Sequence, residues 1–144
     1  MKMSLDENEK ILEMLSGLFQ FNESEQFTQA AIAVTDDELV FYDDNAPDEK
    51  QTIRYVYHIK KRISLENVLL VLDEKIKKNK FLKNMGRLNF IVEEEDEDGD
   101  IEPTEVLFYY YLNDRRAAET FLDELKKLKI KTKKRKIDLN YPNL

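Results

Sequence analysis

The segment from Glu105 to Leu112 constrains the fold most, because its centre reads Val-Leu-Phe-Tyr-Tyr-Tyr-Leu and is apolar or aromatic throughout. β-Branched and aromatic residues favour extended strands. Successive side chains of a strand point to opposite faces of the sheet, so both faces of this segment are apolar. A strand of this kind is covered on both sides. We therefore predict that it lies at the centre of a sheet or covers an interface.

Further segments have strand character. Residues 29–35 and 38–42 are apolar and partly β-branched, and the short acidic turn between them predicts a hairpin. Residues 52–59 and 87–92 alternate apolar and polar side chains, as half-buried strands do. Residues 63–76 fit either an apolar helix stripe or a buried strand, and we favour a strand because strands flank the segment on both sides.

Two segments have helical spacing. Residues 4–18 begin with Ser4 and Glu7, the spacing of a capping box, and predict an N-terminal helix. Its apolar stripe consists of Ile11, Leu12, Leu15 and Leu18. A second helix is predicted after the cap Asn113-Asp114. Its stripe consists of Ala118, Phe121, Leu122, Leu125 and Leu128.

The composition is that of a single folded domain. The chain has 144 residues, of which 42% are hydrophobic and 37% charged. It has no cysteine, so a disulfide framework and a thiol nucleophile are excluded. The sequence lacks an apolar run near the ~20 residues of a membrane helix, and its first residues do not follow the plan of a signal peptide. We therefore expect a cytoplasmic protein.

The net charge of −7 conceals an alternation along the chain. Residues 1–50 carry 3 basic and 13 acidic side chains (−10), and residues 51–92 carry 10 and 3 (+7). Residues 93–125 carry 2 and 13 (−11), and residues 126–144 carry 8 and 1 (+7). One interpretation is attraction between segments of one fold, and the other is a basic face that meets an anionic partner.

Three segments together resemble the bacterial pleckstrin-homology-like (PH-like) domain family. Residues 32–42 (Ile-Ala-Val-Thr-Asp-Asp-Glu-Leu-Val-Phe-Tyr) look like the opening hairpin of that family. Residues 63–68 (Ile-Ser-Leu-Glu-Asn-Val) look like its "Ile-Pro-Leu-x-x-Ile" step after the third strand. Residues 114–125 (Asp-Arg-Arg-Ala-Ala-Glu-Thr-Phe-Leu-Asp-Glu-Leu) look like its C-terminal helix.

This resemblance implies an α+β fold. The expected architecture is a bent antiparallel β-sandwich or barrel of six to seven strands, closed by a C-terminal amphipathic helix, with an added N-terminal helix. We expect an N-terminal helix and connector over residues 1–26, the PH-like domain over 27–129 and a basic C-terminal tail over 130–144. The tail could also form an extra strand.

The resemblance also implies a binding or assembly role, because members of this family bind phosphoinositides, peptides or other proteins. The opening turn departs from a phosphoinositide site, since Asp36, Asp37 and Glu38 would repel a phosphate. We therefore expect a non-catalytic module that binds a protein or self-associates. A peripheral binder of anionic lipid is the alternative.

The basic residues gather in three places that could form a patch for an anionic partner. The predicted patch contains Lys60, Lys61, Arg62, Lys77, Lys78, Lys80, Lys83, Lys131, Lys133, Lys134, Arg135 and Lys136. No aromatic residue lies within the run from 126 to 136 to stack on nucleic-acid bases, and the chain is acidic overall, which argues against a nucleic-acid partner.

The acidic stretch from 93 to 105 has spacing close to an EF-hand calcium loop, with a glycine at the sixth position. The candidate calcium ligands are Glu94, Asp96, Asp98, Asp100 and Glu105. The flanking segments have the character of strands, whereas an EF-hand requires helices. We therefore favour a solvated hairpin loop and expect no resident metal, and calcium binding through this loop is the alternative.

The sequence offers no catalytic constellation. His58 is the only histidine, and it shares a predicted strand face with Arg54 and Lys60. With three glycines in the chain, a glycine-rich phosphate loop is also absent. We expect neither enzymatic activity nor a cofactor.

Overall fold

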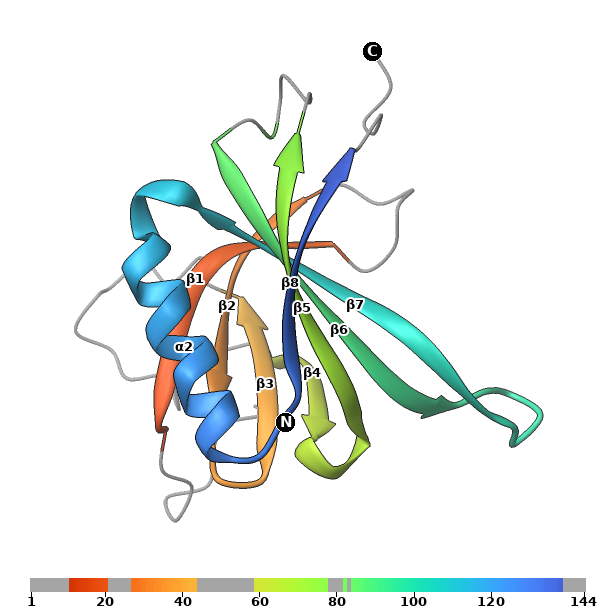
Figure 1. The fold of residues 1–144 in the computed structure, drawn as a ribbon. Helices are drawn as coiled ribbons and strands as arrows, with labels where there is room; N and C mark the ends of the chain where they lie inside the picture. The colour runs from red at the N-terminus through yellow and green to blue at the C-terminus, as the bar shows by residue number, and fades with distance from the viewer. Residues whose placement is uncertain (1–10, 21–26, 44–58, 78–81, 83, 139–144) are drawn as a thin grey trace.

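The computed structural model describes residues 11–20, 27–43, 59–77, 82 and 84–138. They form eight strands, two short 3₁₀ helices and one α-helix (Figure 1). In chain order these are β1 (Glu13–Gln20), β2 (Thr28–Val34), β3 (Glu38–Asp43), β4 (Ile59–Ser64), η1 (Leu65–Asn67), β5 (Val68–Lys77), β6 (Met85–Glu95), β7 (Ile101–Tyr111), η2 (Leu112–Asp114), α2 (Arg115–Lys127) and β8 (Thr132–Asp138).

The strands join in the order β4-β3-β2-β1-β7-β6-β5-β8. Every neighbouring pair is antiparallel except β5 and β8, which run parallel. β7 lies between β1 and β6, and its residues 106–110 are all buried. The prediction of a central strand with two apolar faces is confirmed.

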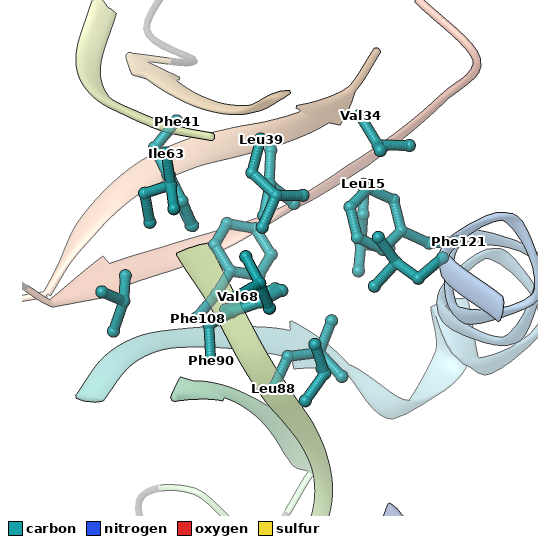
Figure 2. Close-up of a cluster of buried hydrophobic side chains, with 14 of the residues drawn as sticks. Leu15, Val34, Leu39, Phe41, Ile63, Val68, Leu88, Phe90, Phe108 and Phe121 are labelled. Carbon is teal, nitrogen blue, oxygen red and sulfur yellow. The ribbon is translucent and has the colours of Figure 1, made fainter. Parts of the chain in front are cut away.

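The sheet bends over on itself, so that β1–β4 face β5–β7 across one core. Figure 2 shows Leu39, Phe41 and Ile63 on one side of this core and Leu88, Phe90 and Phe108 on the other. The Phe41 ring stacks on Phe19 at 4.9 Å between centroids and meets Phe90 edge-on at 5.7 Å. These geometries are favourable for aromatic pairs.

The helix α2 covers an open side of this core. Its buried residues are Ala118, Phe121, Leu122 and Leu125, which recur at the predicted helical spacing. In Figure 2 the Phe121 side chain points toward Leu15 of β1. The apolar stripe of this helix is confirmed, although Leu128 is only partly buried and packs at its end.

The predicted N-terminal helix over residues 4–18 is wrong in its described part, because residues 13–20 are β1. Leu15, Gly17 and Phe19 are buried, while Met14 and Ser16 are exposed, which is the period of a strand. The apolar residues of this segment fit both periods. Pairing of β1 with β2 and β7 selects the strand, and residues 4–10 lie outside the described residues.

The predicted closed sandwich or barrel of six to seven strands is also wrong. The described residues form one open, mixed sheet of eight strands with β4 and β8 at its edges. Two of the eight strands lie outside the predicted set: β1, in the segment predicted as a helix, and β8, in the segment predicted as a basic tail or an extra strand. The only α-helix of the described residues is α2.

The other strand predictions fall into two groups. The hairpin formed by β2 and β3 is confirmed, with Thr35 Oγ1 accepting the backbone N–H of Glu38 at 3.0 Å in its turn. Residues 63–76 are extended apart from η1, which confirms strand over helix. The predicted strand over 52–59 and its His58 lie outside the described residues, apart from Ile59 at the start of β4.

The close approach of β1 to β7 requires glycine at position 17. An added Cβ would lie 2.0 Å from Tyr109 O, a backbone atom that cannot rotate away. We expect Gly17→Ala to lower the free energy of unfolding by about 3 kcal/mol, because β1 must shift from β7. Denaturant unfolding measures this loss. The exposed neighbour provides the control, and a Ser16→Ala change as large as that of Gly17→Ala would contradict the explanation.

Candidate functional site

A pocket of about 510 Å³ opens between β5, β8 and the beginning of α2. It is lined by Asp73, Lys75, Tyr110, Leu112, Arg115, Lys134, Arg135 and Lys136. Five of these eight residues are basic and one is acidic, although the Arg135 side chain lies on the opposite face, where it pairs with Glu74. The pocket therefore presents a positive surface to an incoming ligand.

The wall of the pocket is fixed by a pairing between Asp73 and Arg115. Arg115 Nη1 and Nη2 donate to the two carboxylate oxygens of Asp73 at 3.1 and 2.8 Å. The hydroxyl of Tyr110 donates to Asp73 Oδ1 at 2.9 Å and also accepts a hydrogen bond from Arg115. Asp73 is only 5% exposed, so its charge is satisfied inside the protein by these two partners.

These contacts raise the pKa of Tyr110 and the pKa of Arg115. Burial, followed by the nearby Asp73 carboxylate, raises the pKa of Tyr110 above its usual value. The hydrogen bonds that Arg115 donates to Asp73 raise its pKa and outweigh the opposing effect of burial. Tyr110 therefore stays neutral and Arg115 stays charged across the physiological range.

A second pocket of about 130 Å³ continues the first one along α2. Its lining consists of Asp73, Leu122, Lys126, Thr132, Lys133 and Lys134. Asp73 and Lys134 line both pockets. The two pockets therefore adjoin each other between α2 and β8, and together we call them the α2–β8 groove.

Three lysines of the larger pocket are exposed and carry uncompensated charge. Lys75, Lys134 and Lys136 form no ion pair within the part of the chain that the structure describes. Lys134 stands opposite Asp73 and Lys136 opposite Lys75 in the ladder between β8 and β5. Paired residues place their side chains on the same face, so these lysines line one side of the groove.

The opposite face of β5 holds β8 in place through a buried acid. Glu74 is fully buried and accepts hydrogen bonds from Arg87 Nε at 2.5 Å and Arg135 Nε at 2.6 Å. Burial lowers the pKa of Arg87, but its hydrogen bonds to Glu74 and Tyr109 raise it overall. A shift of β8 would take Arg135 away from Glu74 and leave that buried carboxylate with one partner fewer. Because an unpaired buried charge is costly, this contact fixes the register of β8.

The structure divides the predicted basic patch. Lys61 and Arg62 lie on β4 and pair with Glu94 and Glu38 at 2.5 and 2.8 Å. Lys77 ends β5. Residues 131–136 lie immediately before β8 or within it, beside β5. Lys78, Lys80 and Lys83 and the side chain of Lys60 lie outside the described residues.

The candidate calcium ligands are not brought together. The chain continues from β6 into β7 through a tight turn in which Asp96 Oδ1 accepts the backbone N–H groups of Asp98 and Asp100. Glu94 pairs with Lys61, and Glu105 accepts a hydrogen bond from Asn89. Among the described residues, no group of three or more acidic or histidine side chains is placed to hold a metal ion.

The sequence reasoning missed Asp73, Lys75, Tyr110, Leu112 and Arg115. A signal was present at the start of α2, where Arg115 and Arg116 lie at the positive end of the helix dipole. Basic residues at that end are unfavourable unless an anion compensates them. Asp73 supplies that anion, but only the fold brings residues 73 and 115 together.

No protein-family model matches the chain. No curated protein sequence matches it either. Among the helices in the described residues, none is long and apolar enough to cross a membrane.

The chain is similar in structure to several solved proteins. The hSac2 domain from human phosphoinositide phosphatase Sac2 is 13% identical over 95% of this chain and 82% of that chain, with a TM-score of 0.50. The C-terminal domain of an unknown protein from Leishmania infantum is 14% identical over 82% and 85%, with a TM-score of 0.47. The DH/PH domains of p115-RhoGEF are 11% identical over 81% and 30%, with a TM-score of 0.42.

These neighbours include PH-like domains, and the likeness to the hSac2 domain supports a PH-like fold. At such low identity the likeness concerns the fold alone. A bacterial origin stays a prediction of the sequence.

The raised pKa of Tyr110 predicts a pH dependence of stability. The unfolded chain loses the Tyr110 proton near pH 10, whereas the folded chain retains it to higher pH. The unfolded state then binds fewer protons, so the free energy of unfolding falls as pH rises above about 10. Tyr110→Phe should cost about 1 kcal/mol at pH 7 and give a shallower fall above pH 10.

Urea unfolding between pH 7 and pH 11.5 tests this expectation. The neighbouring Tyr111 is 39% exposed, so Tyr111→Phe is the matched control and should follow the unchanged protein. Equal slopes for the unchanged protein and Tyr110→Phe would exclude the proposed coupling between Tyr110 and folding.

Proposed function

We propose that this chain is a non-catalytic binding module that takes an acidic segment of a partner protein in the α2–β8 groove. The observation that carries this proposal is the cluster of lysines in the groove, Lys75, Lys134 and Lys136, which are exposed and unpaired among the described residues. A PH-like fold is compatible with such a role but does not specify the ligand.

The charge balance of the groove supports an anionic ligand. Asp73 is its buried acid, and Arg115 and Tyr110 already satisfy that carboxylate. An incoming carboxylate therefore meets ammonium groups rather than a free negative charge. Leu112 and Leu122 add apolar surface to the two ends of the groove, which suits a peptide better than a simple inorganic anion.

The distribution of charge favours a protein segment over a membrane surface. A membrane presents an anionic plane and attracts basic residues spread over a broad face. Here Lys61 and Arg62 of β4 are occupied by acidic partners, and the unpaired lysines follow β5 and β8. A narrow line of charge inside a groove fits an extended chain.

The groove also supports binding rather than catalysis. Its carboxylate is held in an ion pair, and its tyrosine has a raised pKa, which makes it a weaker acid and keeps it protonated, so that no tyrosinate base forms near neutral pH. We propose that binding takes place in the cytoplasm, as the cysteine-free composition predicts. Self-association remains the second protein-binding candidate, with acidic residues of another copy in the groove.

A labelled peptide of four Glu-Thr repeats tests the proposal by fluorescence anisotropy, with four Gln-Thr repeats as the neutral comparison. We expect the acidic peptide alone to bind and its affinity to fall with salt. Lys136→Glu should weaken binding about tenfold, because an attraction becomes a repulsion. Lys127→Glu changes net charge equally on α2 outside the groove lining and should have an effect below about twofold.

Flotation with phosphatidylserine vesicles at low and high salt tests the alternative, which is binding to an anionic lipid surface. Vesicle binding without peptide binding would replace the proposal by a lipid-binding role. Equal effects of Lys136→Glu and Lys127→Glu on the peptide would remove the groove as the site.

A further inference from the structure

We propose that the acidic segment binds as an added β-strand along the free edge of β8, with its acidic residues at every second position. This inference rests on the proposed function and names the geometry of the ligand. It follows from the directions of backbone and side-chain groups on β8.

β8 is an edge strand of the described sheet, with β5 on one side. The backbone N–H of Val71 donates to Lys131 O at 2.9 Å, and Val71 stands opposite Thr132. In a parallel ladder, backbone groups of successive residues point alternately to the two sides of the strand. Residues 131, 133, 135 and 137 therefore direct their backbone groups toward β5.

The backbone groups of Lys134 and Lys136 consequently point to the free edge. No strand of the described residues pairs with them there. Such a row of unused N–H and C=O groups is a template for a further strand. The same two residues carry the side chains that line the groove.

The spacing of Lys134 and Lys136 along β8 determines where the ligand must carry its acidic residues. Lys134 and Lys136 lie two residues apart, so their ammonium groups stand on one face of β8 and about 7 Å apart along it. An added strand places alternate side chains on that same face. Glutamate or aspartate at every second position would then stand beside each lysine in turn.

An added strand would lie across β8 from β5, beside the groove, and its side chains on the groove face would reach over β8 toward the beginning of α2. The pocket of about 510 Å³ lies there, between Arg115 and Leu112 on one side and residues 134–136 of β8 on the other. Toward the end of α2 the groove narrows to the pocket of about 130 Å³. The added strand would therefore pair with the second half of β8.

Lysines on an edge strand also oppose uncontrolled pairing, because an apolar strand would leave their charges uncompensated. That effect favours the proposed ligand, since an acidic strand neutralises these charges. The edge would thus reject apolar strands and accept acidic ones.

Lys134 gives a direct test in the full chain. Lys134→Ala removes the charge and keeps the outward N–H, whereas Lys134→Pro removes both and leaves the ladder to β5 intact. We expect the Glu-Thr peptide to bind Lys134→Pro about tenfold more weakly than Lys134→Ala, with similar melting temperatures. Equal affinities of the two variants would overturn strand addition.

Backbone N-methylation of the peptide supplies a second readout that needs no variant. A strand turns alternate N–H groups toward its neighbour, so methylation at either the four Glu or the four Thr residues should abolish binding to the unchanged protein. Methylation of the other set should change affinity less than about threefold.

The two proposals fail in different ways. If the unmethylated peptide binds and both methylated sets bind equally well, the groove recognises charge without strand pairing, and the proposed function survives alone. If the unmethylated peptide does not bind, the proposed function itself fails.

Discussion

Three residue pairs between β1 and β7 join the two halves of the bent sheet. Leu18, Phe19 and Gln20 pair with Tyr109, Phe108 and Leu107. This short ladder positions β2–β4 across the core from β5 and β6, and it requires the absence of a side chain at Gly17. The core between the halves can then close around Phe19, Phe41 and Phe108, because strands distant in sequence meet there.

From this joint outward, two neighbouring acids on β5 determine the shape of the groove. Asp73 and Glu74 point to opposite faces of the strand, as alternation requires. Asp73 binds Arg115 at the start of α2, and Glu74 binds Arg135 of β8. Each of these two ion pairs connects β5 to an element that follows it by about 40 to 60 residues in the sequence. Buried ion pairs add little net stability, but a partner lost from one is costly, so they specify position.

These contacts between segments distant in sequence explain which parts of the fold could be predicted from the sequence and which could not. The period of apolar residues located β7, the hairpin of β2 and β3, and α2, because those elements bury the faces that their own patterns indicate. Residues 13–20 fit a helix because Leu15 and Leu18 have helical spacing, but Leu15 and Phe19 also share one face of a strand. Backbone pairing of β1 with β2 and β7 favours the strand over the helix, and the local sequence pattern does not show this pairing.

The site was harder to predict than the fold. The run of basic residues in 131–136 was recognisable, but Asp73, Tyr110 and Arg115, which line the same pocket, lie 16 to 63 positions away in the sequence. Their contribution depends on the parallel pairing of β8 with β5. Parallel strands are joined by long connections, so no short-range sequence pattern predicts their pairing.

The alternating charge of the sequence allowed two interpretations, and the structure assigns them to different strands. On β4, Lys61 and Arg62 attract Glu94 and Glu38 from acidic segments, which is attraction within the fold. On β8, Arg135 is the basic residue that a buried acid holds, while Lys134 and Lys136 remain unpaired among the described residues. Exposed lysines held at fixed spacing repel one another at low ionic strength. A ligand with matching negative charge would relieve that repulsion, so the uncompensated charge of β8 contributes to association rather than to folding.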